Sequence, residues 1–246
     1  MKNTIKYLLQ KNLGFENYLF IFSLFKIYTL RWDKKENDFF HFLEMIPENC
    51  IVLDVGANIG VMTAHLSKRK KSIEVFSFEP IPYNITCLKR VVSFFKFNNV
   101  VIFEFALGNE QGRAEMVIPI DNSVKMHGLS HVIHPSILEN NKGEKAEVLI
   151  KKLDSIEQLN VPGVKIGAMK IDVENFENFV ILGAIELINK HKPIIYIELW
   201  ENDNRNRCFE IIKELGYEIN VFCSGKLEKY NKEIHSTQNF IFKSLL

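Results

Sequence analysis

The chain has 246 residues, of which 47% are hydrophobic and 25% are charged, and its formal net charge is +1. This length and composition are typical of a globular protein with one large domain or two small ones. The balanced charge argues against a strongly basic nucleic-acid-binding surface. The four cysteines include no Cys-x-x-Cys pair, which favours reduced thiols in a cytoplasmic protein over a disulfide framework or a zinc site.

The first 50 residues are expected to form a helical extension, ahead of a main domain at residues 51–246. An apolar stripe recurs at helical spacing near the end of this extension, at Phe39, Phe42, Leu43 and Ile46. Residues 18–30 are rich in Phe, Leu and Ile but are too short to span a bilayer, and no secretory signal is evident. We expect this segment either to pack on the domain or to lie against a membrane or partner.

From residue 51 onward, the pattern predicts strands alternating with helices. The first half holds three predicted strands, at 51–55, 74–78 and 100–106, separated by helices at 59–69 and 83–97. Strands that are linked through helices favour a mainly parallel sheet with helices on both faces. The chain is therefore expected to adopt an α/β fold.

The alternation is interrupted in the middle of the chain. A turn at 108–112 and a short strand at 114–118 lead into a long polar loop at 119–145, then a strand at 147–150 and a short helix at 153–158. Long irregular loops are uncommon inside compact domains and are usually functional. We therefore expect residues 121–145 to recognise the substrate.

The alternation then resumes toward the C-terminus. Predicted strands at 168–171 and 194–199 are followed by helices at 176–190 and 204–215. The last two strands, at 218–222 and 239–242, are separated only by a charged turn at 226–232. Since no helix joins them, they should pair in antiparallel fashion at the end of the sheet.

The junction after the first strand carries the strongest functional signal. Asp54 lies near the end of the strand, and Gly56-Ala57-Asn58-Ile59-Gly60 follows before a helical pattern begins. In open α/β sheets such a junction holds a nucleotide-like cofactor. Asn58 stands where a dinucleotide-binding turn would have its middle glycine, which argues against an NAD-dependent oxidoreductase. The nearby acid suits a ligand with a positive amine or sulfonium better than a diphosphate.

Three further strand ends should meet at the same edge of the sheet. Glu79 ends the second strand, where an acid accepts hydrogen bonds from ribose hydroxyls. Ala106 and Leu107 offer small apolar groups against which an adenine could lie. Asp172 and Glu174 end the fourth strand, where a reacting group would meet the cofactor.

In this order, the motifs resemble the FkbM family of S-adenosylmethionine-dependent methyltransferases, a branch of the class I, Rossmann-like methyltransferases. The matching blocks are residues 53–60, 78–80, 106–108, 152–155, 170–174, 182–184, 197–198 and 239–240. One position departs from the family pattern, because Asn175 stands where the family usually has glycine after Asp-Val-Glu. Asparagine tolerates left-handed backbone better than other non-glycine residues, so the turn is expected to survive.

The resemblance implies S-adenosylmethionine as the cofactor and no metal. It also implies that the glycine turn wraps the methionine portion, Glu79 holds the ribose and Ala106-Leu107 flank the adenine. The residues expected at the cofactor are Asp54, Gly56, Ala57, Asn58, Gly60, Thr63, Glu79, Pro80, Asn84, Ala106, Leu107 and Asp172. Family members typically methylate hydroxyl oxygens, so the expected acceptor is a glycan or a related polar metabolite.

An alcohol acceptor is a poor nucleophile until a base begins to remove its proton. The candidate bases are Asp172, Glu174, Glu198 and His131. Asp172 could instead hold the ammonium group of the cofactor, and Glu198 could cap the following helix. The histidines at 127, 131 and 134 could also be solvated loop residues. The alternative function is a catalytically silent domain that docks a partner or a membrane through its N-terminal helix.

Overall fold

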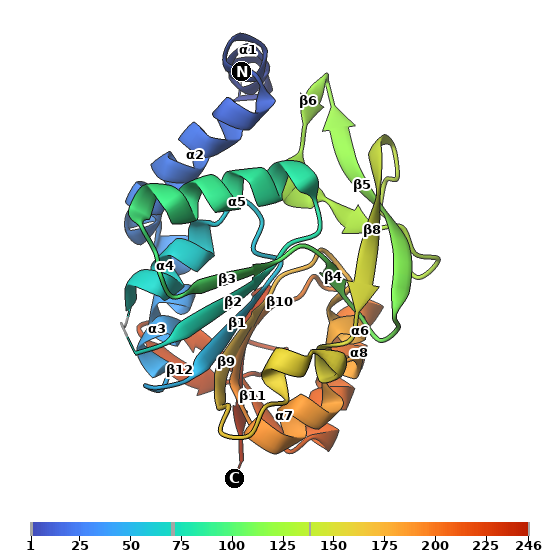
Figure 1. Ribbon diagram of the computed structural model, residues 1–246. Coiled ribbons are helices and arrows are strands. Elements are labelled where there is room, and N and C mark those ends of the chain that lie inside the picture. Colours follow the sequence, from blue (N-terminus) through green and yellow to red (C-terminus); the bar gives the residue numbers. More distant parts are fainter. Residues whose placement is uncertain (1, 70–71, 138, 246) are drawn as a thin grey trace.

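The computed structural model describes residues 2–69, 72–137 and 139–245, and its centre is an eight-stranded sheet (Figure 1). The strand order is β12-β11-β13-β10-β9-β1-β2-β3. Five strands run parallel to their neighbours: β1 (Ile51–Val55), β2 (Glu74–Phe78), β3 (Val100–Phe103), β9 (Ile166–Ile171) and β10 (Ile194–Glu198). The mainly parallel sheet expected from the sequence is confirmed.

The last strand is inserted between its two neighbours in the sheet. β13 (Asn239–Ser244) is antiparallel to β10 on one side and to β11 (Tyr217–Cys223) on the other. The expected antiparallel pair is therefore confirmed. The prediction of a turn at 226–232 was wrong in part, because β12 (Lys226–Lys229) pairs with β11 as the edge strand. Charged side chains protect such an edge from pairing with other chains, and they also made this strand resemble a turn.

Helices cover both faces of the sheet (Figure 1). On one face, α3 (Asn37–Met45) and α4 (Val61–Arg69) enclose a core with the strands, and α5 (Pro82–Phe95) lies beside them. The other face is covered by α6 (Glu177–Leu182), α7 (Ile185–His191) and α8 (Asp203–Glu214). Because both faces are buried, the central strands are mostly apolar, with Asp54 in β1 and Lys170 in β9 as charged exceptions, which made them readable from the sequence.

A single helix predicted at 176–190 is in fact two helices, α6 and α7. Gly183 separates the two helices and packs against the turn at Gly108 and Asn109. A Cβ atom at Gly183 would lie 2.0 Å from the carbonyl oxygen of Gly108. The short helix predicted at 153–158 is likewise a pair of 3₁₀ turns, Leu153–Ser155 and Glu157–Leu159.

The middle of the chain forms a second, five-stranded sheet, which includes parts of the predicted central loop. Its strands are β4 (Ala106–Leu107), β5 (Gly112–Asp121), β6 (Val124–Lys125), β7 (His131–Val132) and β8 (Gly143–Lys151). The strands predicted at 114–118 and 147–150 are confirmed as the cores of β5 and β8, which extend into the predicted loop at both of its ends. The loop prediction was wrong there and at β6 and β7, and the third strand ends at Phe103 rather than at residue 106. Cross-strand ion pairs lie on the exposed face, Lys145 with Glu115 at 3.0 Å and Arg113 with Glu147.

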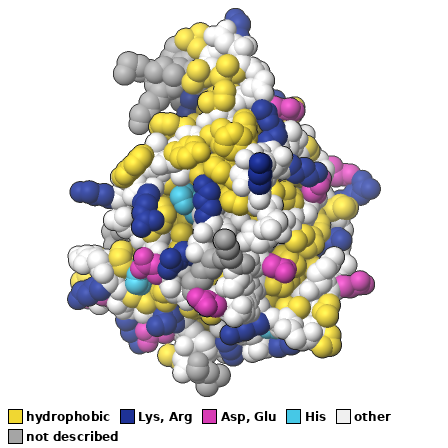
Figure 2. Space-filling view, turned by 60° about the vertical axis from the view of Figure 1, so that its left-hand side comes forward, with side chains coloured by type: hydrophobic (Ala, Val, Ile, Leu, Met, Phe, Trp, Pro, Cys, Tyr) yellow, Lys and Arg dark blue, Asp and Glu magenta, His cyan; other side chains and the backbone are white. Residues whose placement is uncertain are grey.

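The N-terminal segment is helical and packs on the sheet domain. It comprises α1 (Lys2–Leu13), α2 (Phe15–Thr29) and two 3₁₀ turns, Leu30–Trp32 and Lys34–Glu36, before α3. The predicted stripe at Phe39, Phe42, Leu43 and Ile46 is buried, as expected. No described helix is both long and apolar enough to cross a bilayer. Large apolar side chains nevertheless remain at the surface of this region (Figure 2).

The close contact between Gly183 and Gly108 leads to a first prediction. Gly183→Ala should lower the free energy of unfolding by about 2 kcal/mol, because the added methyl group meets backbone that cannot move aside cheaply. Urea denaturation measures this effect. Leu182→Ala is the matched control, since that neighbouring side chain is 42% exposed and should cost less than about 1 kcal/mol. Equal stability of the two variants would contradict the packing argument.

Candidate active site

A cavity lies at the carboxyl ends of β1, β2 and β9, between the main sheet and the second sheet. Most of the expected cofactor residues line it: Gly56, Asn58, Glu79, Pro80, Asn84, Ala106, Leu107 and Asp172. Asp54, Ala57, Gly60 and Thr63 do not belong to its wall.

The glycine turn fits closely under the end of β9. Gly56 and Gly60 have positive φ angles of 77° and 83°, and Asn58 has a φ of 51°. A Cβ atom at Gly56 would lie 1.9 Å from the carbonyl oxygen of Asp172, so the turn requires glycine there. The amides of Gly56 and Ala57 both donate to the carbonyl oxygen of Phe78, at 3.1 and 3.0 Å.

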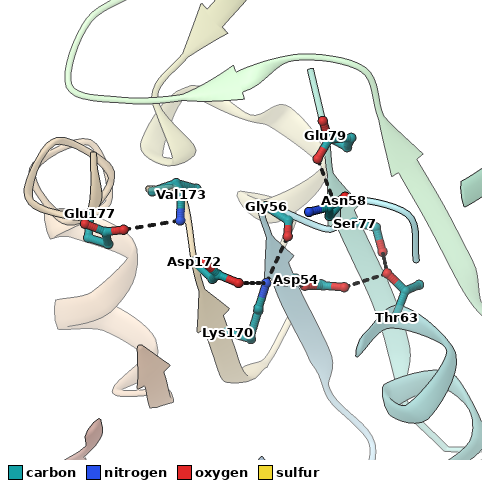
Figure 3. Close-up of polar contacts among 10 residues, drawn as sticks. All are labelled: Asp54, Gly56, Asn58, Thr63, Ser77, Glu79, Lys170, Asp172, Val173 and Glu177. Carbon is teal, nitrogen blue, oxygen red and sulfur yellow. Dashed lines mark hydrogen bonds and ion pairs between the residues drawn. The ribbon is translucent and has the colours of Figure 1, made fainter. Parts of the chain in front are cut away.

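A buried lysine connects this turn to β9 (Figure 3). Lys170 Nζ donates to the Gly56 carbonyl oxygen at 2.9 Å and lies 3.6 Å from Asp54 and 3.4 Å from Asp172. Burial alone would lower the pKa of Lys170, but the charges of Asp172 and Asp54 hold it above its ordinary value. Asp54 also accepts a hydrogen bond from the Thr63 hydroxyl at 2.5 Å. Asp54 therefore faces the protein's own cation, Thr63 binds its other carboxylate oxygen, and neither residue lines the cavity.

Glu79 holds the opposite side of the turn. Its carboxylate accepts hydrogen bonds from the amide of Asn58 at 2.8 Å, the amide of Ile81 at 2.9 Å and the Asn84 side chain at 3.2 Å. Only 4% of Glu79 is exposed, and burial raises its pKa to about 7. The sequence placed this acid correctly at the end of β2, but its hydrogen bonds depend on the start of α5.

The cavity wall has the chemistry that the expected cofactor needs. The side-chain oxygens of Asn58 and Asn84 are buried, line the cavity and have no hydrogen-bond partner among the described residues. Acceptor oxygens of this kind suit hydroxyl and ammonium donors. In the described part of the chain no Lys or Arg belongs to the wall, whereas Glu79, Asp172 and Glu174 do. Such a wall fits a cationic ligand rather than a diphosphate.

Two buried acids shape the turn after β9. Glu177 accepts hydrogen bonds from the amides of Val173 at 3.3 Å and Asn175 at 3.1 Å (Figure 3). This turn gives Glu174 and Asn175 positive φ angles of 52° and 70°. Asn175 therefore adopts a left-handed conformation, and the turn is kept although the family usually has glycine at this position. Burial and the charge of Asp172 raise the pKa of Glu174 to about 9.

Two acids of the N-terminal segment, Glu36 and Asp38, lie near Glu198, and no sequence motif predicted this. Burial, followed by the charge of Asp172, raises the pKa of Glu198 to about 7. Glu36 and Asp38 lie in the same electrostatic environment, and burial raises the pKa of each. Asp38 accepts a hydrogen bond from the Tyr196 hydroxyl at 3.3 Å. No sequence signal linked these two acids to β10, because their placement depends on how α3 packs.

The histidine at the cavity is His127 and not His131. The ring of His131 is 3% exposed and is held in the second sheet, with its nitrogens 3.0 Å from the Leu129 carbonyl oxygen and 3.1 Å from Asn141. His127 lines the cavity, and burial with the nearby charge of Lys6 lowers its pKa to about 4. The described residues contain no cluster of three His, Cys, Asp or Glu suited to a metal ion.

The parallel sheet, its antiparallel last strand and the cavity at the glycine turn define a class I, Rossmann-like methyltransferase fold. Residues 54–228 match the family described as the Methyltransferase FkbM domain. The chain belongs to this family, as its sequence motifs predicted. This membership supports S-adenosylmethionine as the cofactor.

Individual relatives share the fold at low sequence identity. Methyltransferase 1 of Beauveria bassiana (strain ARSEF 2860) is 22% identical over 65% of this chain and 72% of its own length. Methyltransferase sdnD of Sordaria araneosa is 20% identical over 71% and 76%. A crystal structure of a methyltransferase FkbM from Methylobacillus flagellatus KT superposes with a TM-score of 0.51 at 16% identity. That match covers 79% of this chain but only 43% of the other, so it establishes the fold alone.

The buried lysine leads to a prediction about stability. Lys170→Met should lower the free energy of unfolding by about 3 kcal/mol or more, because it leaves the carboxylate of Asp54 buried without its cation. Asp54→Asn combined with Lys170→Met should recover part of this loss, since no charge then remains buried. Urea denaturation of the single and double variants measures both effects. A Lys170→Met variant as stable as the wild type would refute this role.

The raised pKa of Glu79 predicts a pH dependence. The folded protein binds this proton more tightly than the unfolded chain, whose carboxyl titrates near 4.5. The contribution of Glu79 to stability therefore falls as the pH rises from about 4.5 to about 7, by about 3 kcal/mol in total. Glu79→Gln should remove this part of the slope, whereas Glu214→Gln, at an exposed carboxyl, should keep it. Urea denaturation across this pH range compares the slopes, and identical slopes would contradict the assignment.

Proposed function

We propose that this chain transfers a methyl group from S-adenosylmethionine to a hydroxyl oxygen of a glycan or a related polar metabolite. The observation that carries the proposal is the position of Asp172. Its carboxylate lines the cavity at the end of β9, directly above the glycine turn and 3.4 Å from Lys170 Nζ. An acceptor hydroxyl that enters the cavity there would meet a carboxylate already held in place.

The expected cofactor contacts divide the cavity into regions. Glu79 and Asn84 would hold the ribose hydroxyls, and the turn at Gly56 and Asn58 would hold the methionine portion. Pro80, Ala106 and Leu107 provide the apolar wall for the adenine. The cofactor supplies an activated methyl group on a sulfonium. The protein itself must align the acceptor oxygen, exclude water and take up the proton of the hydroxyl.

Asp172 is the best-placed base among the four candidates. Glu174 also lines the cavity, but a pKa of about 9 keeps it protonated at neutral pH, so it would donate a hydrogen bond to an acceptor oxygen. Glu198 and His131 lie outside the cavity wall. The acceptor proton would therefore move to a carboxylate oxygen of Asp172, beside the ammonium of Lys170.

The proposal predicts a separation of binding from turnover in Asp172→Asn. This variant should bind S-adenosylhomocysteine with little change in affinity, because the isosteric amide preserves the turn. Its methyl transfer should fall about 100-fold, because the amide cannot accept the proton. Calorimetry measures the binding, and mass spectrometry of cellular glycans, with and without the protein, detects the added methyl group. Lys190→Gln, at an exposed position on α7, is the surface control.

The outcomes distinguish the alternatives. Loss of S-adenosylhomocysteine binding in Asp172→Asn would assign this side chain to the ammonium group of the cofactor. A wild-type protein that binds NAD and not S-adenosylhomocysteine would overturn the methyltransferase proposal. Methylation found in another class of metabolite, with unchanged glycans, would overturn the acceptor. Unaltered turnover in Asp172→Asn would exclude it as the base.

A further inference from the structure

An exposed apolar row runs along the outer face of α2. Ile21, Phe25, Tyr28 and Trp32 follow one another at intervals of three or four residues, and we call them the outer stripe. Their exposed fractions are 51%, 60%, 58% and 79%. Phe94 of α5 is 54% exposed and lies beside α2, with its ring 5.8 Å from that of Phe20. Apolar surfaces that extend over several neighbouring side chains mark interaction sites.

The packing of α2 does not require the outer stripe. The inner face of the helix already buries Tyr18, Leu19 and Ile27 against α4 and α5. On another side, the rings of Phe15 and Phe22 lie 6.5 and 6.1 Å from His127 at the cavity. Because α2 carries apolar side chains on more than the face that packs on the domain, one apolar face remains exposed and can contact another apolar surface.

Cations border the outer stripe. The ammonium of Lys68 lies 5.8 Å from the ring of Tyr28, and the guanidinium of Arg90 lies 4.2 Å from the ring of Phe20. Arg31, Lys34 and Lys35 are exposed beside Trp32 in the chain. Residues 1–36 contain seven basic and three acidic side chains, although the whole chain has a net charge of only +1. Figure 2 shows this pattern as apolar side chains bordered by Lys and Arg.

We propose that the outer stripe and its cations bind the surface of a membrane that contains anionic lipid. Phe25 and Ile21 would enter the boundary between headgroups and acyl chains, and Trp32 and Tyr28 would lie at headgroup level. The Lys and Arg side chains would meet the lipid phosphates and carboxylates. The helix would lie on the bilayer, which agrees with the lack of a described helix long enough to cross it.

The pattern of charge favours a lipid surface over a second copy of this chain. Two copies joined through the outer stripe would bring their cationic borders together, and like charges repel. The position of the stripe also relates it to the site. The ring of Phe22 in α2 lies 6.1 Å from that of His127 in the cavity wall, so the helix that carries most of the outer stripe also backs the cavity.

Vesicle co-sedimentation of the full chain tests the proposal without any assay of methyl transfer. Vesicles of phosphatidylcholine with about one third phosphatidylserine should bind the protein at least about tenfold better than phosphatidylcholine alone, and added salt should weaken binding. Phe25→Ser with Trp32→Ser should lower the partition coefficient by about tenfold or more. Lys34→Gln with Lys35→Gln should lower it by about tenfold.

Matched variants on other surfaces control for general effects. Val161→Ser removes an apolar side chain that is 51% exposed, and Lys190→Gln with Lys213→Gln removes two exposed cations from α7 and α8. Both should bind vesicles as the wild type does. Circular dichroism confirms that each variant is folded. Since Trp32 and Trp200 are the two tryptophans, a Trp200→Phe chain should show a blue shift of Trp32 emission on vesicles.

Three results would overturn the proposal. The first is no preference for the anionic vesicles at low salt. The second is vesicle binding by Phe25→Ser with Trp32→Ser that equals that of the wild type, or no blue shift of Trp32 emission when the Trp200→Phe chain meets the vesicles. The third is a dimer, measured by light scattering, that Phe25→Ser with Trp32→Ser dissociates, because the stripe would then be covered by a second copy.

Discussion

The ion pair of Lys170 with Asp54 and Asp172 is the constraint on which the site depends. One ammonium group, almost completely buried, contacts the glycine turn, the end of β1 and the end of β9. Burying a carboxylate such as Asp54 is costly unless a cation offsets its charge, so these two side chains fix each other. The turn is thereby held before any ligand arrives. Asp172 shares the same cation and lines the cavity. The buried ion pair that stabilises the core therefore also holds a carboxylate at the cavity wall.

Two segments outside the main sheet close the cavity from opposite sides. The second sheet provides Met116 and Val132 of the wall, the link between β6 and β7 provides Gly128 and Ser130, and α2 packs behind His127. They also meet each other, since the side chain of Gln10 in α1 and the backbone of Lys125 in β6 exchange hydrogen bonds at 3.3 Å. The N-terminal helices therefore do more than extend the domain. They support the cavity wall at His127 and the β6 edge of the second sheet.

The sequence was sufficient where local chemistry determined the structure. The apolar run of β1 and the two glycines after it predicted the strand, the turn and the helix that follows. The cores of β5 and β8 were also predicted, at 114–118 and 147–150, but not their full length or their pairing, which includes the contact of Glu115 with Lys145 across the strands. The sequence does not show which of His127 and His131 faces the cavity. The pairing of β7 with β5 places His131 in the second sheet, away from the cavity. Glu36 and Asp38 reach the site through the packing of α3, which no short motif records.

The side chain of Asn175 links segments that a glycine at this position could not link. Its side chain donates to Glu139 at 3.0 Å and accepts from Asn202 at 2.6 Å, so it joins the segment after β7 to the loop before α8. A glycine at this position would adopt the same backbone angle but would leave both partners without this bond. The segment after β7, the turn after β9 and the loop before α8 are therefore linked through this one side chain. A loop transplanted from a relative with glycine here would arrive without its anchor.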